Sequence, residues 1–291
     1  MKLANSDVIR IQRTELLNRF PNAQSYLDEL DARAMDKGAG SLIVIKVGGG
    51  IIEDAELMRD CIEAVSQLVA LGYFPVVVHG GGPQINQALE SLREESVFRD
   101  GLRVTSEQAI GLVAQALTDI NQALVRSFVQ NGIPSVGLSG VFLAKYLDQA
   151  KYGEVGHVVR VAKESIEQAV TEYSLPIVSC LAHDEHGAPL NVNGDDAAAE
   201  LVAALRPLEY VSFTPTGGVN GADGGLIRHI TAVQAQRLNA SGQLGGGMHK
   251  KVVEALRLVQ SGTVSKIVIV HPRRFIEELF SEDGYGTIIT G

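Results

Sequence analysis

Four short stretches of this 291-residue chain combine lysines, carboxylates and glycines in a way that suits phosphate chemistry. Each stretch follows or precedes an apolar run, and in order they are residues 42–50, 76–83, 191–196 and 245–251. Glycines at the end of a buried strand let backbone amides approach an anion closely, and a lysine there acts as a compact point charge. The first stretch holds Lys46 and the last holds Lys251. Together the four stretches predict a site that transfers a phosphoryl group.

The charged residues of these stretches also have simpler interpretations. Lys46 lies inside an otherwise apolar strand, where an unpaired ammonium group is costly, so it must meet either a bound anion or a structural carboxylate. Lys250 and Lys251 fall in the first turn of a predicted helix, where the helix dipole disfavours cations unless an anion is near. Adjacent helical residues point about 100° apart, so we expect one of the two lysines to face the site. Asp195 either caps its helix or holds two lysines across a phosphate site.

Several common catalytic motifs are missing from the sequence. There is no G-x-x-x-x-G-K-[ST] phosphate loop, no G-x-G-x-x-G dinucleotide fingerprint and no G-x-S-x-G nucleophile turn. His183 and His186 have no third or fourth ligand nearby in the sequence, so we predict no metal site there. The glycine-rich stretches therefore call for another mode of phosphate binding.

Composition narrows the class of protein. A net charge of −9 disfavours a nucleic-acid surface, which needs clustered lysines and arginines. No apolar run reaches the ~18–20 residues of a membrane span, and no signal peptide is apparent, so we expect a cytoplasmic protein without a membrane partner. Cys61 and Cys180 are the only cysteines, and both lie in apolar patterns that favour buried free thiols.

Strand-like and helix-like segments alternate along the chain, which predicts an α/β fold with a mainly parallel sheet between helix layers. Ligands are expected at the carboxyl ends of its strands. Residues 141–165 resemble strands or a hairpin. Residues 5–36 predict two helices broken near Pro21 that either fold back on their own domain or contact another subunit. The expected strands are 42–47, 74–79, 133–138, 175–180, 210–214, 266–270 and 287–290, and the main expected helices are 54–71, 83–93, 106–130, 195–205, 232–237, 248–261 and 274–280.

From about residue 40 onwards, the order of these motifs resembles the amino-acid kinase family, and within it the N-acetyl-L-glutamate kinases. The resemblance implies a three-layer αβα sandwich with an open, mainly parallel sheet. It also implies an N-terminal helical extension (1–37), a lobe for the amino-acid substrate (38–190) and a lobe for the nucleotide (191–291). The motifs that carry it are Lys46-Val-Gly-Gly, His79-Gly-Gly-Gly-Pro, Gly101-Leu-Arg-Val-Thr, Tyr152-Gly-Glu-Val-Gly, Asn191-Val-Asn-Gly-Asp and Gly246-Gly-Met-His-Lys-Lys.

The same resemblance implies roles for individual residues. Lys46 and Lys251 would flank the phosphoryl group that passes from ATP, supplied with Mg²⁺, to N-acetyl-L-glutamate, and Asp195 would orient both lysines. Arg103 would bind the α-carboxylate of the substrate. The other implied substrate-binding residues are Gly81, Gly82 and Asn191, and the implied nucleotide-binding residues are Gly48, Gly49, Thr214, Thr216, Gly217 and Gly218.

One departure leaves alternatives open. Pro215 stands near the place where many family members carry an aspartate, and this variant resembles the kinase-like domains of N-acetylglutamate synthases. The chain is then an active kinase of arginine biosynthesis, or a non-catalytic module that senses arginine or N-acetylglutamate. A third alternative is a kinase for another acyl substrate, such as an aminoadipate derivative. The C-terminal segment resembles an allosteric arginine site and the N-terminal helix resembles one that interlaces subunits, which implies an arginine effector bound near Glu278, Glu282 and Gly284 and a homo-oligomer.

Overall fold

The computed structural model describes residues 6–37, 42–91, 93, 95–172, 174–240, 246–280 and 284–291. The linker predicted at 38–40 and the candidate effector residue Glu282 lie outside the described residues. Within the described ranges, no helix combines the length and the apolar character needed to cross a membrane. Cys61 and Cys180 are buried free thiols, as predicted.

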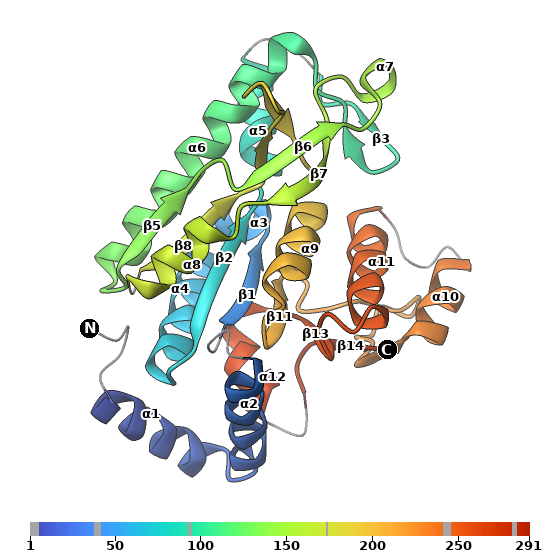
Figure 1. The fold of residues 1–291 in the computed structure, drawn as a ribbon. Coiled ribbons are helices and arrows are strands. Elements are labelled where there is room, and N and C mark those ends of the chain that lie inside the picture. The colour runs from blue at the N-terminus through green and yellow to red at the C-terminus, as the bar shows by residue number, and fades with distance from the viewer. Residues whose placement is uncertain are drawn as a thin grey trace.

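One eight-stranded sheet forms the centre of the molecule (Figure 1). Its strands run in the order β12-β14-β13-β11-β1-β2-β8-β5, and every neighbouring pair is parallel except β13 with β14. β1 and its neighbours β2 and β11 are almost completely buried, and β1 and β2 are rich in β-branched residues, as expected for parallel strands covered on both faces. The strands are β1 (Leu42–Val47), β2 (Phe74–His79), β5 (Ser135–Leu138), β8 (Leu175–Ser179), β11 (Glu209–Phe213), β12 (His229–Thr231), β13 (Lys266–Val270) and β14 (Thr287–Thr290).

Helices cover both faces of this sheet, so the predicted three-layer αβα architecture is confirmed. α4 (Ala55–Ala70) and α6 (Glu107–Gln130) lie over one face. α8 (Glu164–Thr171), α9 (Gly194–Leu205) and α11 (Gly246–Gln260) lie over the other. The sheet continues without a break through both predicted lobes, because β1 of the first pairs with β11 of the second.

A smaller four-stranded sheet stands above the carboxyl ends of the central strands, in the order β10-β9-β6-β7 (Figure 1). The predicted hairpin at 141–165 is present as the antiparallel pair β6 and β7, but α7 interrupts it and α8 begins at its end. The elements of this region are β3 (Phe98–Arg99), β4 (Leu102–Arg103), β6 (Phe142–Tyr146), α7 (Gln149–Tyr152), β7 (Gly156–Val161), β9 (Leu181–His183) and β10 (Pro189–Asn191).

The two N-terminal helices, α1 (Ser6–Arg19) and α2 (Ala23–Lys37), break at Pro21 as predicted and pack on their own chain. Leu27 is buried, and the ring of Tyr26 meets the ring of Phe280 edge-on at 5.4 Å. Both terminal nitrogens of the Arg13 guanidinium donate hydrogen bonds to the carboxylate of Asp31, at 2.5 and 3.0 Å. The interpretation in which the extension folds back on its domain is therefore confirmed, and a role in oligomer contacts stays a prediction.

Short helices complete the fold at the glycine turns and at the C-terminus. α3 and α5 begin where β1 and β2 end, so two helix N-termini stand beside each other at the carboxyl edge of the sheet. The sequence did not predict α3, because its first two residues are glycines. The remaining elements are α3 (Gly49–Glu53), α5 (Gly82–Glu90), α10 (Ala232–Ala240), the 3₁₀ helix η1 (Pro272–Arg274) and α12 (Phe275–Phe280).

Candidate active site

Strand register places the two central polar groups of the site side by side. Lys46 of β1 is paired with Ser212 of β11, and each is the last residue but one of its strand. Register partners in neighbouring strands point to the same face of a sheet, so both side chains emerge toward α9. The first turn of α9 is fixed by its cap, because the side-chain oxygen of Asn193 accepts hydrogen bonds from the backbone amides of Asp195 and Asp196 at 2.9 and 3.3 Å.

Asp195 joins the two lysines predicted to flank the phosphoryl group. One carboxylate oxygen, Oδ1, accepts from Lys46 Nζ at 2.8 Å and from Lys251 Nζ at 2.6 Å. Lys251 also donates to the hydroxyl of Ser212 at 3.0 Å. The three charged side chains are only 11–14% exposed. The next lysine, Lys250, faces elsewhere, as the helical spacing predicted, and pairs with Asp196 at 2.7 Å.

Burial and mutual attraction set the charges of this cluster. Burial by itself would raise the pKa of the Asp195 carboxyl, but the two ammonium groups outweigh it and hold the pKa well below its usual range. Burial opposes the charged form of Lys46 too, yet the contact with Asp195 raises its pKa. Burial and repulsion by Lys46 lower the pKa of Lys251 to about 8. The cluster carries a net charge of +1 at neutral pH, which suits an anion.

A pocket of about 210 Å³ opens over this cluster. Its walls come from the two glycine turns after β1 and β2, the β3–β4 hairpin and the segment that leads into α9. Of the three charged residues in the cluster, Lys46 and Asp195 line the pocket. Lys251 contacts Asp195 from α11. The lining residues are Lys46, Gly48, Gly49, Gly80, Gly81, Gly82, Ile85, Phe98, Gly101, Leu102, Arg103, Val155, Cys180, Asn191, Val192, Asn193, Gly194 and Asp195.

Two of the glycines are required by close packing. A β-carbon on Gly49 would lie 2.5 Å from the ring of Pro83, and one on Gly81 would lie 2.3 Å from Ile120. At Gly48 and Gly82 a β-carbon would meet nothing within 4 Å. The turns after β1 and β2 therefore interlock. Among the described residues no side chain caps the starts of α3 and α5, and the glycines of both turns line the pocket, where backbone amides suit an anion.

Arg103 and Asn191 also contribute polar side chains to the lining of the pocket. The buried Arg103 guanidinium donates to the Ser96 hydroxyl at 2.6 Å and to the Gly82 carbonyl at 3.1 Å. It also lies 4.8 Å from the centre of the Phe98 ring. Asn191 donates to the Thr105 hydroxyl at 3.0 Å. Both predicted substrate residues are thus held by neighbours within one pocket, with donor groups left over for a ligand.

The predicted nucleotide residues after β11 lie beside this pocket rather than in its lining. The hydroxyls of Thr214 and Thr216 are 3.0 Å apart, and Thr216 donates to the Gly218 carbonyl at 2.9 Å. Gly217 is in the left-handed region at φ +74°. Pro215 stands 3.6 Å from the β-carbon position of Gly50, at the first turn of α3. Pro215 therefore lies between the glycine turn after β1 and the Thr214–Gly218 loop after β11.

The candidate effector residues form a separate group at the C-terminus. The buried Glu278 carboxylate accepts hydrogen bonds from the backbone amides of Tyr285 and, at 2.7 Å, Gly286. Gly284 has φ +59°, and its β-carbon position lies 3.4 Å from Glu278 and 3.7 Å from the guanidinium of Arg228. The structure brings Glu278 and Gly284 together, and neither lines the pocket over Lys46.

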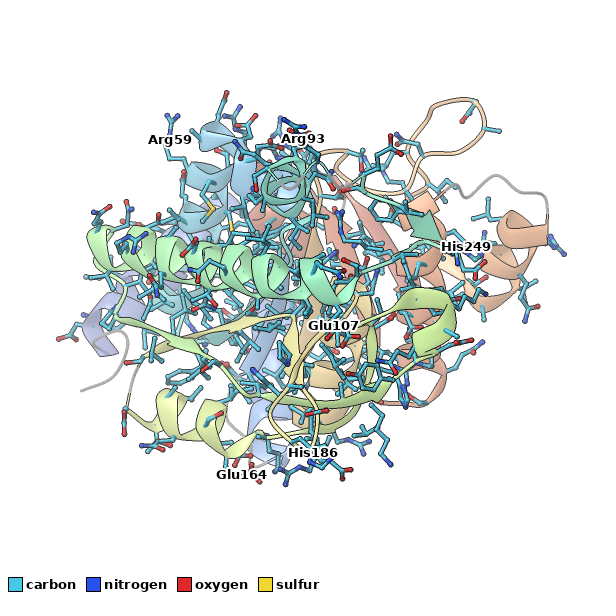
Figure 2. The ribbon with its side chains drawn as sticks, turned by 90° about the horizontal axis from the view of Figure 1, so that it is seen from above. Arg59, Arg93, Glu107, Glu164, His186 and His249 are labelled. Carbon is cyan, nitrogen blue, oxygen red and sulfur yellow. The ribbon has the colours of Figure 1, made fainter. Side chains whose placement is uncertain are left out.

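Sequence reasoning missed several contributors to the site. Ser212 stands at the same place in its strand as Lys46, but only the register shows that the two strands are neighbours. Cys180 lines the pocket next to Lys46, and its pKa is raised to about 12 by burial, so its thiol stays neutral. His186, considered and set aside as a metal ligand, is 81% exposed and lies on the opposite side of the molecule from Arg59 and Arg93 (Figure 2).

Comparison with known proteins places the chain among relatives. The model of the amino acid kinase family matches residues 41–271. The acetylglutamate kinase of Campylobacter curvus is 33% identical over 264 residues, which are 88% of this chain and 94% of that protein. The mitochondrial protein arg-6 of Neurospora crassa is 36% identical over 249 residues, or 84% of this chain, but the chain spans only 28% of it.

Solved structures agree with these sequence matches. The protein smu.665 of Streptococcus mutans UA159 superposes with a TM-score of 0.76 and 30% identity, covering 86% of this chain and 98% of that one. The N-acetylglutamate synthase of Neisseria gonorrhoeae, solved with coenzyme A and N-acetyl-glutamate, gives a TM-score of 0.80 over 93% of this chain and 62% of its own. At 19% identity, that likeness speaks for the fold alone. The family model covers most of the chain, and the chain belongs to the amino acid kinase family.

Proposed function

We propose that this chain is an acetylglutamate kinase, which transfers the γ-phosphoryl group of ATP to the γ-carboxylate of N-acetyl-L-glutamate in arginine biosynthesis. The observation that carries the proposal is the contact of Lys46 and Lys251 with one oxygen of Asp195 at the floor of a glycine-walled pocket. Two ammonium groups held in this way by a shared carboxylate are arranged to neutralise charge on a phosphoryl group. The name of the Campylobacter curvus relative supports the same activity.

The chemistry needs no general base. A γ-carboxylate has an ordinary pKa near ~4.3 and is already ionised at neutral pH. One of its oxygens attacks the γ-phosphorus in line, the bond from that phosphorus to the bridging oxygen of ADP breaks, and an acyl phosphate and ADP result. Catalysis then consists of aligning two anions and offsetting the charge on the transferred group. Lys46, Lys251 and the amides at Gly48 and Gly49 would supply this charge stabilisation.

The nucleotide would approach from the side of the Thr214–Gly218 loop, with its phosphates toward Lys251. Among the described residues, no three or more histidine, cysteine, aspartate or glutamate side chains are grouped as metal ligands. Mg²⁺ would therefore be held mainly by the phosphate oxygens of ATP, and it would neutralise part of their charge. Asp195 is already shared between two lysines, so its task is to hold them.

The acyl amino acid would occupy the pocket between the sheet edge and the β3–β4 hairpin. Arg103, which lines this pocket, would offer guanidinium donors to the α-carboxylate, and Lys46, which also lines it, would meet the carboxylate that is phosphorylated. A pocket of about 210 Å³ suits a ligand of the size of N-acetyl-L-glutamate. An aminoadipate derivative, one carbon longer, is the competing substrate, and comparing kcat/KM for the two decides between them.

The first test is ATP-dependent formation of an acyl phosphate, trapped as the hydroxamate, with N-acetyl-L-glutamate and Mg²⁺. We expect product from the wild-type chain and a loss of at least about 100-fold in kcat for Lys251→Ala, because the lost contact belongs to the transition state. Absence of product from protein that still binds N-acetyl-L-glutamate would reject the kinase.

A sensing role is the second candidate, and the C-terminal group favours it specifically. The Glu278 carboxylate and the Arg228 guanidinium both stand near Gly284, a place where the chain offers charges of both signs. The structure of the Neisseria gonorrhoeae synthase with L-arginine concerns a protein of the same fold. We expect arginine to change the kinetics or to raise the thermal midpoint of the wild type, and Glu278→Gln to weaken that response. Equal responses in both proteins would remove Glu278 from an arginine site.

A further inference from the structure

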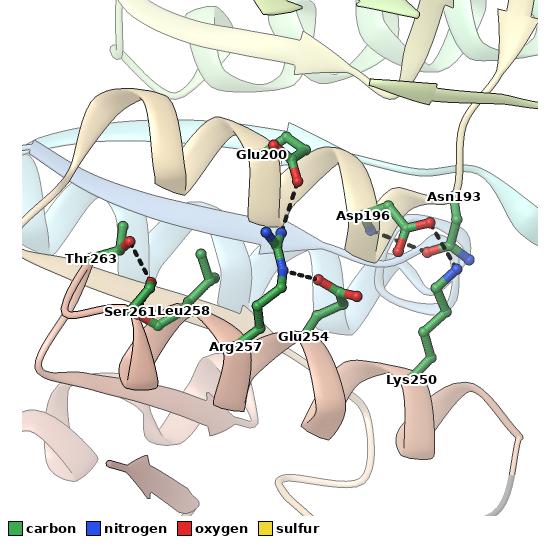
Figure 3. A network of polar contacts seen from close by, with 9 residues as sticks. All are labelled: Asn193, Asp196, Glu200, Lys250, Glu254, Arg257, Leu258, Ser261 and Thr263. Atoms are coloured by element: carbon green, nitrogen blue, oxygen red, sulfur yellow. Dashed lines mark hydrogen bonds and ion pairs between the residues drawn. The ribbon is translucent and has the colours of Figure 1, made fainter. Parts of the chain in front are cut away.

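The start of α11 is joined to the start of α9 by two ion pairs, not one. Lys251 pairs with Asp195 inside the site, and the adjacent Lys250 pairs with the adjacent Asp196 at 2.7 Å. Figure 3 shows the outer pair crossing between the two helices. None of the proposed roles of ligand or catalytic group uses the outer pair, because Lys250 and Asp196 do not line the pocket.

The outer pair adds little net stability. Its side chains are 22% and 33% exposed, and burial raises the pKa of Asp196 despite the contact with Lys250, so the cost of desolvation outweighs the attraction. α11 begins at Gly246, so Lys250 and Lys251 lie in its second turn, where the helix dipole acts on them only weakly. Asp195 and Asp196, by contrast, lie in the first turn of α9, where the dipole favours carboxylates.

The geometry of the two pairs suits positioning. Adjacent residues project about 100° apart around a helix, so two contacts at adjacent residues fix the rotation of α11 about its own axis. Among the described side chains of α11, the fully buried apolar positions begin at Val252, after both lysines, and Met248 before them is only partly buried against the core. The lysine pairs therefore add two polar contacts at the end of α11 that faces the phosphate site.

We propose that the Lys250–Asp196 pair is a positioning device for Lys251. It fixes the second turn of α11 against the first turn of α9, so that the Lys251 ammonium group stays on Asp195 and Ser212 and in line with the transferred phosphoryl group. Misplacing a reacting group by about 1 Å can cost roughly 100-fold in rate. A smaller rotation of α11 is therefore expected to lower kcat by about 10-fold.

A second ion pair between the same two helices provides a matched control. Arg257 of α11 pairs with Glu200 of α9 at 2.8 Å and with Glu254 of its own helix at 2.9 Å (Figure 3). It stands seven residues beyond Lys250, or about 10 Å along the helix axis. Its loss removes the same kind of helix–helix contact, far from the phosphate site.

The test compares Lys250→Met with Arg257→Met in the full chain. This inference rests on the proposed function, so kcat and KM are measured in the hydroxamate assay. We expect kcat to fall about 10-fold in Lys250→Met, with KM for N-acetyl-L-glutamate within about 2-fold, and no change in Arg257→Met. Lys250→Arg should recover part of the rate. Asp196→Asn should show the same fall in kcat, and it provides the test if Lys250→Met does not fold. The double variant Lys250→Met/Asp196→Asn should have a kcat no lower than that of either single variant.

A second readout does not depend on activity. The same proteins are treated with formaldehyde and a borohydride, and dimethylation of Lys251 is followed by mass spectrometry. We expect Lys251 to react several-fold faster in Lys250→Met than in the wild type or in Arg257→Met. Equal kcat in Lys250→Met and the wild type, equal losses in both methionine variants, or unchanged labelling of Lys251 would overturn the inference. If the labelling differs as expected while the wild type forms no acyl phosphate, the positioning stands and the proposed function fails.

Discussion

Replacing Asp195 by asparagine tests the centre of the site most directly. The substitution keeps the shape of the side chain and removes the negative charge that Lys46 and Lys251 share at 2.8 and 2.6 Å. At an effective dielectric constant of about 20, each of these contacts supplies a gross attraction of about 6 kcal/mol. Much of this attraction offsets the desolvation of three charges that are only 11–14% exposed.

The net effect is large because two buried cations lose the anion that they share. Removing one partner of a buried ion pair costs about 3–5 kcal/mol. An unfolding entropy of about 2.1 cal/mol/K per residue amounts to about 0.6 kcal/mol/K for 291 residues, so we expect the thermal midpoint of Asp195→Asn to fall by about 5–8 °C at pH 7. In the same protein, kcat should fall by at least about 100-fold, because neither lysine is held on the phosphoryl group.

Differential scanning calorimetry of the wild type, Asp195→Asn and Asp196→Asn measures this effect. Asp196 has one, more exposed partner, so its midpoint should fall by less than about 2 °C. The folded-state pKa of Asp195 lies below its ordinary value, so its contribution is present above about pH 4 and is lost as the pH falls further. The gap between wild type and Asp195→Asn should therefore narrow below pH 4. An asparagine variant as stable as the wild type at pH 7 would refute this reasoning.

Three further predictions follow from single contacts. Burial and the neighbouring lysine lower the pKa of Lys251 to about 8, so kcat/KM should fall as the pH rises through about 8. Lys251→Arg should remove this fall at alkaline pH. A wild-type pH profile that stays flat to about pH 9.5 would contradict the prediction. Arg103→Ala should raise KM for N-acetyl-L-glutamate by about 10- to 100-fold through the loss of charge-assisted hydrogen bonds, and an unaltered KM rejects that role. Gly49→Ala should lower the free energy of unfolding by about 1–3 kcal/mol, since its β-carbon would lie 2.5 Å from Pro83. Gly48→Ala should leave the free energy of unfolding nearly unchanged, because a β-carbon there meets nothing within 4 Å. Equal urea midpoints for the two variants would count against close packing at Gly49.

The sequence predicted the central elements well where local pattern and tertiary role agree. Continuous β-branched runs such as 42–47 and 74–79 have only one favourable place in a soluble fold, a covered parallel strand, and both are observed there. Ser106 was expected to cap the long helix, and its hydroxyl accepts from Ala109 at 3.1 Å. The sequence did not predict several short elements, among them α7, α8 and β12. Three to eight residues seldom carry enough periodicity to separate helix from strand.

The fate of the N-terminal helices could not be derived from their own residues. Their apolar face allowed packing on the same domain or on another subunit, and the periodicity of the helices is the same in both cases. The contacts of Tyr26 with Phe280 and of Arg19 with Glu277 depend on where the C-terminal helix lies, which no local pattern specifies.

The sequence by itself determined which chemistry was available: two lysines, one aspartate and glycine turns at the ends of apolar strands, in an order typical of one kinase family. Only the tertiary structure decided that these groups meet. Asp195 is 149 residues from Lys46 and 56 from Lys251, and their contact requires the register of β1 with β11 and the docking of α9 and α11 on one face of the sheet. The sequence shows which charged groups and glycines are present. Two ammonium groups can share one carboxylate oxygen only because the packing of the sheet and its helices brings distant residues together.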